Sequence, residues 1–411
     1  MIKKFFKWIF KLIVGIILLI AVTYGGFHLW EYATGGKFVE YLEANSETIK
    51  LEENFSYDLM RSDLEKNDLI LVGEIHGFHE PIVFDVDFFK YLHKNHGVRH
   101  YVVELDFVQG QLMNEYLVTG DQDILKTVLK KWVVVQGRNN QDYFDKYAAL
   151  QQFYGTLPET AKFKFIGIDR IQDYDLITEY VENFPSSDSI QKAGTTATLL
   201  DKINSLSVGY SGNEDTLFLL SHVKENLLQL ADKVNREAVL FSNFEKLFKQ
   251  YKLQNRKLYG YFGLYHVFQY RVNGADPLAS KIRASDLNLD GKILSINFLM
   301  NDSYMVMPSQ ELPEFMREPG PYTRMPISAD NMLFMYLVGI KDFNRMTPES
   351  SKSLVKLNAE DSPYSNTIRM NQAIQLLPVT DLLEFNDKGK PYTQYTIFVR
   401  NSDWAQPMES K

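Results

Sequence analysis

The sequence predicts an α/β protein with a mostly parallel sheet, flanking helices and a helical cap insertion, preceded by one N-terminal transmembrane helix. Short apolar runs that suit buried strands alternate with stretches of helical periodicity along most of the chain. Residues 172–256 contain no clear strand, and within them 215–250 are rich in Leu, Lys and Glu at helical spacing. A long uncharged apolar segment near the N-terminus predicts the membrane helix.

The uncharged segment is Leu12–Trp30, which is just long enough to cross a bilayer. Glu31 follows it, and four lysines precede it: Lys3, Lys4, Lys7 and Lys11. The positive-inside rule therefore predicts a single-pass protein with a cytoplasmic N-terminus and an extracytoplasmic body, whose partner over residues 12–30 is the lipid bilayer. A cleaved signal peptide is the alternative. No A-x-A cleavage site follows the apolar core, so we expect an uncleaved signal anchor.

Length and composition limit the domain organisation and the classes of function open to this protein. A chain of 411 residues has room for one large α/β domain with an insertion, or for two domains. The net charge of −8 includes the N-terminal lysines, so the body is acidic and unsuited to nucleic-acid binding. The chain has no cysteine, which excludes disulfides, thiolate metal sites and a cysteine nucleophile.

We expect three parts along the chain. Residues 1–31 are predicted to form a cytoplasmic stub and the transmembrane signal anchor, and residues 32–67 a stalk with a helix leading into the body. Residues 68–411 are predicted to form the α/β domain, in which 171–256 are the helical insertion.

A βαβ unit begins the body. Leu69–Gly73 is a short apolar run typical of a buried strand, and it breaks at the turn GEIHG over 73–77. Glu80-Pro81 opens a helix, because proline suits the first turn and an acid suits the positive end of the helix. A second apolar strand follows over 100–103.

The later elements continue the alternation. Helices are predicted over 108–118, 123–131 and 141–154, and a third strand over 162–169. Beyond the insertion, strands are predicted over 257–263 and 292–298, with a helix over 277–283 between them. Residues 300–323 hold four prolines and are predicted as loop, and late strands are predicted over 331–340 and 395–400.

Four side chains capable of chemistry follow strand ends. Glu74 and His76 lie just past the first strand, Glu104 ends its expected neighbour, and His266 follows the strand over 257–263. Ligands of parallel sheets bind outside the carboxyl ends of the strands, so we expect these side chains to share one pocket. Taken alone, His76 is consistent with an ordinary loop histidine. Either glutamate, taken alone, is consistent with a carboxylate that caps a helix. Their common position at strand ends favours a functional site.

This set of side chains supports two kinds of chemistry. An imidazole can act as a general base with a carboxylate orienting it, and two close carboxylates can divide into an acid and a base. Two histidines with one or two carboxylates are equally a ligand set for a divalent metal. The chain has no G-x-S-x-G elbow, Walker loop or G-x-G-x-x-G motif, which argues against a common serine hydrolase and a nucleotide enzyme.

Weaker candidates surround this set. His79, Asp169, Arg170 and Arg138 are predicted to contact the substrate. The alternatives are a structural ion pair between Asp169 and Arg170, and a solvated loop position for Arg138.

The turn GEIHGFHE, the strand end VVELD and the later GLYH together resemble the superfamily of erythromycin esterase-like proteins, ChaN-like haem-binding proteins and TIKI/TraB proteases. The resemblance covers residues 68–298 and rests on Gly73, Glu74, His76, Gly77, Glu104, Gly263 and His266. Erythromycin esterases usually have one more residue between the Glu and the His, so the spacing here is closer to ChaN-like proteins. TIKI/TraB turns more often lack the Glu.

The resemblance has different implications in each branch. The esterase branch makes His76 a general base for water, helped by Glu74 and Glu104, with His266 stabilising charge or donating a proton. The protease branch holds a divalent metal with the same four side chains, and the ChaN branch makes the pocket a haem or iron site. We expect a membrane-anchored hydrolase that cleaves an ester or amide in a small-molecule or peptide ligand. A haem- or metal-binding protein and a catalytically inactive scaffold are the alternatives.

Overall fold

The computed structural model describes residues 2–50, 55–132, 135, 141–182, 196–209, 214–377, 383–384 and 389–408. The strands of its central sheet are β1 (Ser46–Thr48), β2 (Leu69–Glu74), β3 (His100–Asp106), β4 (Lys164–Asp169), β5 (Leu258–Gly263), β6 (Ile293–Asn301), β11 (Lys352–Lys356) and β13 (Tyr395–Arg400). Their order is β1-β11-β13-β6-β2-β5-β3-β4. The strands from β13 to β4 run parallel, whereas β11 and β1 are antiparallel to their neighbours. The predicted mostly parallel sheet is confirmed.

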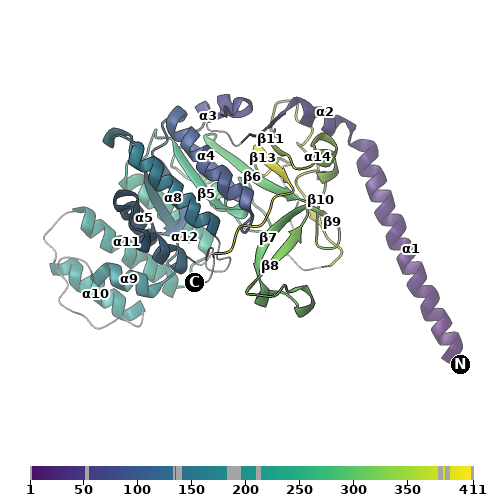
Figure 1. The fold of residues 1–411 in the computed structure, drawn as a ribbon, viewed down its shortest axis with the longest axis horizontal. Coiled ribbons are helices and arrows are strands. Elements are labelled where there is room, and N and C mark those ends of the chain that lie inside the picture. The colour runs from purple at the N-terminus through teal and green to yellow at the C-terminus, as the bar shows by residue number, and fades with distance from the viewer. Residues whose placement is uncertain are drawn as a thin grey trace.

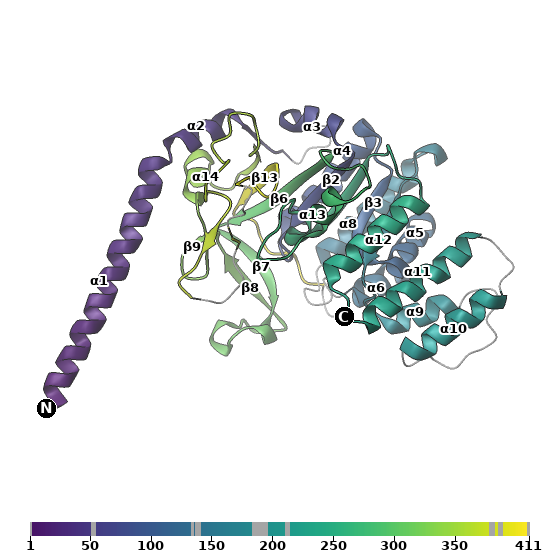
Figure 2. The same ribbon diagram turned by 180° about the vertical axis from the view of Figure 1, so that it is seen from behind.

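Helices cover both faces of this sheet. Figure 1 shows α4 (His79–His96) and α8 (Gln141–Thr156) over one face, and Figure 2 shows α12 (Arg236–Gln250) and α13 (Leu278–Ala284) over the other. The described residues between β4 and β5 are helical, as predicted for the insertion. They form α9 (Tyr174–Glu182), α10 (Thr196–Gly209), α11 (Glu214–Ala231) and α12, while α5 (Phe107–Thr119) and α6 (Gln122–Lys131) precede β4.

β2 lies inside the sheet, and all six of its residues are buried. Ile70 and Val72 point into the hydrophobic core beneath α4 and α8, whereas Leu69 and Leu71 point into the core beneath the insertion helices. A strand covered on both faces needs apolar residues at every position, which explains the continuous apolar run in the sequence.

Three predictions about the sheet and its surroundings need correction. β3 is not the neighbour of β2, because β5 lies between them.

Residues 300–323 are not simply loop, since they contain β7 (Ser303–Pro308) and the beginning of β8 (Tyr322–Ile327), which pair as an antiparallel hairpin. Proline lacks a ladder N–H, but here Pro308 ends a strand and three others lie in the hairpin tip, where no such N–H is needed. The strand expected over 331–340 is reduced to β9 (Asp330–Asn331) and β10 (Met335–Leu337), which form a small sheet with β12 (Ala373–Ile374).

The N-terminal helix α1 (Ile2–Thr34) projects away from the body, as both ribbon views show (Figures 1 and 2). Its segment Phe5–Thr34 is long and apolar enough to cross a membrane, a test that a signal sequence also meets. The region predicted as a stalk and first helix carries α2 (Gly36–Ala44), β1 and α3 (Arg61–Lys66). β1 is an edge strand of the sheet, and Phe38, Tyr41 and Leu42 of α2 are buried.

Hydrogen bonds and a buried ion pair join the C-terminal end of α1 to the body. The buried carboxylate of Glu31 accepts hydrogen bonds from the Gly339 amide at 2.6 Å and from the Tyr336 hydroxyl. Arg369 donates to the Glu31 carbonyl and to Thr34 Oγ1, each at 2.7 Å. Its guanidinium also pairs with Asp342 in α14 (Ile340–Met346). We call Glu31, Tyr336, Asp342 and Arg369 the α1 latch.

A second buried ion pair lies beneath the sheet. Lys146 of α8 is 2.6 Å from Asp85 of α4, and both side chains are at most 1% exposed. The Tyr259 hydroxyl donates to the other oxygen of Asp85 at 2.5 Å, and Tyr101 donates as well. The Lys146 ammonium also lies 4.0 Å from the ring centroid of Tyr261. The pair is therefore enclosed by groups that compensate its charges.

We predict that Lys146→Ala lowers the free energy of unfolding by about 3–5 kcal/mol, because Asp85 is left buried without its cation. Denaturant unfolding of the full chain in detergent micelles measures this loss. The matched control is Lys126→Ala, which removes an exposed pair with Asp123 and is expected to change the free energy little. Equal losses in the two variants would contradict the assignment.

Candidate active site

Glu74 and His76 form a hydrogen-bonded pair at the end of β2. Nδ1 of His76 is 2.8 Å from Oε1 of Glu74, which also accepts from the Tyr143 hydroxyl. Oε2 of Glu74 accepts from the Tyr261 hydroxyl at 2.7 Å. Burial raises the pKa of Glu74, but His76, Lys146 and the Tyr143 hydrogen bond outweigh it and lower the pKa below its ordinary value. Because Glu74 is thus a carboxylate, Nδ1 of a neutral His76 carries the proton and Nε2 carries the lone pair.

Glu104 and Asp169 share one guanidinium. Arg236, the first residue of α12, donates from Nη2 to Glu104 at 2.5 Å and to Asp169 at 2.6 Å, and from Nε to Asp169 at 3.0 Å. The other Glu104 oxygen accepts from the Gly263 amide at 2.7 Å. Burial raises the pKa of Glu104, but His266, His76 and Arg236 hold it well below its usual range. Arg236 therefore bridges the ends of β3 and β4.

His266 lies between two carboxylates in the short helix η3 (Leu264–Val267) that follows β5. Its Nε2 is 3.6 Å from Glu104, and its Nδ1 is 2.7 Å from Oε1 of Glu237 in α12. Burial lowers the pKa of His266, but Glu104 and Glu237 outweigh it and raise the pKa to about 10. His266 is therefore an imidazolium at neutral pH. Arg236 Nη1 lies 3.4 Å from its Nε2, so two cations sit together among carboxylates.

Gly263 allows these groups to converge. A Cβ at this position would lie 3.0 Å from Nε2 of His76 and 3.6 Å from Oε2 of Glu104. Both side chains thus approach the end of β5, where any larger residue would push His76 aside. The central position of β5 brings Glu104 to His76, although β2 and β3 are not neighbours.

A cavity of about 1030 Å³ opens over this cluster. Its polar floor is Glu74, His76, Glu104, Arg236 and His266, so the sheet edge supplies all four of the strongest predicted site residues. The opposite wall is largely apolar and comes from the β7–β8 hairpin and the β9–β10 loop, including Met305, Met325, Pro326, Ile327 and Phe334. The cavity is therefore amphipathic, with charge at one side and apolar side chains at the other.

The weaker candidates have different positions. His79 pairs with Asp142 of α8 at 2.9 Å and does not line the cavity. Asp169 holds Arg236, and its expected partner Arg170 has an exposed side chain. Arg138 lies outside the described residues.

The site contains four residues that sequence reasoning missed: Tyr143, Arg236, Glu237 and Tyr261. Arg236 and Glu237 follow the N-cap Asn235, where an acid is expected for helix-dipole reasons alone. Tyr261 alternates with other aromatic residues in β5, which is also the pattern of a buried strand. None of these positions carries a local signal that separates a site residue from an ordinary helix start or core residue.

These side chains do not fit a divalent metal. Carboxylates that ligate a metal need oxygens that are free of other partners. Here the oxygens of Glu74 and Glu104 already accept from hydroxyl, amide and guanidinium groups. Among the described residues, no group of three or more His, Asp or Glu side chains is arranged to hold a metal ion.

No family model and no curated protein matches the sequence. Solved structures share its fold. A Bacillus cereus protein aligns with a TM-score of 0.65 and 15% identity over 92% of this chain and 100% of that one. A succinoglycan biosynthesis protein aligns with a TM-score of 0.62 and 13% identity over 91% of this chain and 99% of its own. A mutant of the erythromycin esterase EreC, in its open conformation, aligns with a TM-score of 0.55 and 12% identity over 87% and 98% of the two chains.

The comparisons confirm the fold that the resemblance implied, and at these identities they show the fold alone. The haem-binding ChaN of Campylobacter jejuni also matches, at 19% identity over 59% of this chain. Its TM-score of 0.30 is too low to support an argument about the ligand of this site.

We predict that the charge of His266 makes stability depend on pH. Its folded-state pKa of about 10 lies above the ordinary 6.5, so the stabilisation is fully present below pH 6.5 and is lost as pH rises through 10. The free energy of unfolding of the unmodified chain should therefore fall across this range more steeply than that of His266→Gln. Denaturant unfolding at a series of pH values measures both slopes. Equal slopes in the two proteins would contradict the assignment of a charged His266.

Proposed function

We propose that this protein is a hydrolase that cleaves an ester or amide with water activated by His76. The observation that carries the proposal is the Glu74–His76 pair, with its 2.8 Å contact, facing the same cavity as the cations of His266 and Arg236. A base for water and positive charge for a developing oxyanion are the two components that such a reaction requires.

The proposed reaction begins with water between His76 and the carbonyl carbon of the substrate. Nε2 of His76 takes a proton as the water oxygen bonds to that carbon, and Glu74 stabilises the imidazolium through Nδ1. Arg236 and His266 stabilise the negative charge on the former carbonyl oxygen. When the bond to the leaving group breaks, the His76 imidazolium returns its proton to the departing oxygen or nitrogen. Glu104 acts as a positioning residue, because it holds both cations.

The fold shared with EreC supports this proposal, since that protein is described as an esterase. Haem binding is the alternative that the sequence resemblance left open, and no contact of the described site favours it. Titration of the purified chain with haem tests it directly, because a bound haem gives a Soret band.

We further propose that α1 anchors the protein in a membrane as an uncleaved segment, with its N-terminus cytoplasmic and its body extracytoplasmic. The four lysines in the N-terminal turns of α1, ahead of its uncharged segment, support this orientation. The α1 latch supports retention of the end of the helix from Glu31 onward. Cleavage beyond Glu31 would remove this residue and leave Arg369 and Asp342 buried without part of their bonding.

We predict that His76→Ala lowers the rate of ester hydrolysis roughly a hundred- to ten-thousand-fold, the usual contribution of a general base. Turnover of a panel of p-nitrophenyl esters and anilides of increasing acyl length measures this, with circular dichroism as the check on folding. The matched control is His79→Gln, which alters a histidine of the same sequence motif outside the cavity and should retain activity. A panel that the unmodified chain does not cleave, or turnover unchanged by His76→Ala, would contradict the proposal.

We predict that the mature protein retains residues 27–34. Intact-mass measurement of the protein extracted from membranes should give a chain that includes α1. The reason is that the α1 latch uses Glu31 and Thr34 in the folded body. A mature chain that begins between residues 12 and 30 would disprove the anchor. One that begins after Thr34 and is still folded would also disprove the structural role of the latch.

A further inference from the structure

We propose that the tip of the β7–β8 hairpin and the loops beside it rest in the bilayer surface, so that the cavity takes a membrane-borne amphiphile. The inference rests on the function proposed above, because it needs α1 in the bilayer and names the substrate class of the same site. We call the five exposed apolar side chains of this region the apolar rim: Phe315, Leu333, Phe334, Leu376 and Leu377.

The apolar rim is a concentration of exposed apolar groups. Outside α1, the described residues include eleven exposed large apolar side chains, and five of them belong to the rim. Phe315, in the helical turn η5 (Glu314–Met316) at the hairpin tip, is 88% exposed. The other four share one patch of backbone, because the Leu376 and Leu377 amides donate to the Met332 and Leu333 carbonyls at 2.9 and 3.0 Å. Such a cluster marks an interaction surface.

The apolar rim lies on the membrane side of the body. In both ribbon views, the β7–β8 hairpin and α1 extend toward the same, lower side of the body, although their directions diverge (Figures 1 and 2). Phe27 of α1 packs on the same hydrophobic cluster as Met332 and Met335, which flank rim residues Leu333 and Phe334. Its ring centroid is 5.7 Å from that of Tyr336 in β10. Phe27 lies within the segment that can cross the membrane, so the rim begins beside that segment.

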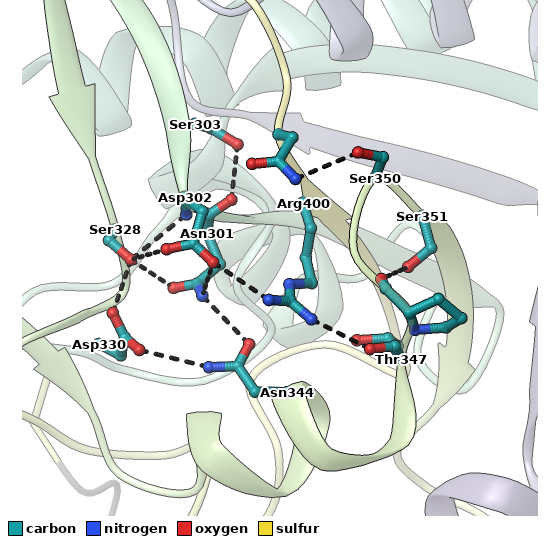
Figure 3. Close-up of polar contacts among 12 residues, drawn as sticks. Asn301, Asp302, Ser303, Ser328, Asp330, Asn344, Thr347, Ser350, Ser351 and Arg400 are labelled. Atoms are coloured by element: carbon teal, nitrogen blue, oxygen red, sulfur yellow. Dashed lines mark hydrogen bonds and ion pairs between the residues drawn. The ribbon is translucent and has the colours of Figure 1, made fainter.

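Two sets of polar contacts fix the position of the rim relative to α1. The α1 latch fixes the helix to β10 and α14. A polar network then ties α14 to the base of the hairpin (Figure 3). In it, Asn301 donates to Asn344 of α14 at 3.1 Å, and Ser328 Oγ lies 2.7 Å from oxygens of Asn301 and Asp330. Arg400 adds bonds to Asp302 and to the Thr347 carbonyl. When α1 crosses a bilayer, the rim therefore lies at the surface of that bilayer.

The cavity continues from the rim to the reactive floor. Phe334 belongs to both the rim and the cavity wall, and Met316, next to Phe315, also lines the cavity. Met305, Met325 and Ile327 line the same cavity as His76. An amphiphile from the bilayer can therefore keep its apolar chain along this wall while its ester or amide reaches the charged floor.

The absence of cysteine makes a site-specific test direct. Full-length Phe315→Cys and Leu377→Cys are labelled with an environment-sensitive NBD fluorophore and reconstituted in phosphatidylcholine vesicles. The matched controls are Val118→Cys and Val208→Cys, which are also exposed, at 71% and 90%, but lie in α5 and α10. We expect a blue shift and quenching by nitroxide-labelled lipid at both rim positions and at neither control. Equal emission at rim and control positions would overturn membrane contact.

A photoreactive phosphatidylcholine with a diazirine in its acyl chain tests the substrate class in the same vesicles. Adducts mapped by mass spectrometry to the cavity-lining strand residues 303–305 and 325–327 support entry of an acyl chain, whereas adducts confined to the hairpin tip at 309–321 overturn it. Vesicle flotation reports α1 insertion separately, and a chain that does not float overturns both the anchor and the rim. None of these readouts uses turnover, so a failed hydrolase assay is distinguishable from a failed membrane contact.

Discussion

Buried carboxylates at the carboxyl ends of parallel strands are the constraint on which the rest of this structure depends. β2, β3 and β4 carry Glu74, Glu104 and Asp169 near their ends, and each residue is at most 3% exposed. A buried carboxylate is costly unless donors or cations compensate it. The helices provide this compensation, since α8 contributes Tyr143 to one face of the site and α12 contributes Arg236 to the other. The helical layers are therefore tied to the charges at the sheet edge as well as to the core.

The compensating groups differ between the two halves of the site. Glu74 meets hydroxyl groups and the imidazole of His76, whereas Glu104 meets a guanidinium, an imidazolium and a backbone amide. As a result, Glu74 fixes the tautomer of His76, while Glu104 and Glu237 keep His266 charged. His76 and the cationic side chains of Arg236 and His266 line one cavity. This division of roles is what links the geometry to the proposed hydrolysis.

The same electrostatic principle operates where α1 meets the body. Glu31 and Asp342 are buried acids. Arg369, itself 1% exposed, pairs with Asp342, whereas the Glu31 carboxylate accepts from the Gly339 amide and the Tyr336 hydroxyl. A hydrophobic helix that ends in such a network has a defined direction relative to the body, which a flexible linker would not give. The proposed membrane contact of the apolar rim follows from this fixed direction, because the hairpin and α1 are held by neighbouring elements.

The sequence by itself determined the parallel α/β class, the helical insertion and the four residues Glu74, His76, Glu104 and His266. These depend on local patterns, because an apolar run forms a strand and its last residues lie at a known edge of a parallel sheet. Only the tertiary structure decided that β5 separates β2 from β3, that residues 300–323 hold a hairpin, and that Arg236 enters the site. Arg236 and Tyr143 lie on helices far from the strand ends in sequence, and a polar residue at a helix start looks the same whether it faces solvent or a buried carboxylate. The partner of such a residue depends on how its helix packs in the fold, and no local sequence pattern predicts that packing.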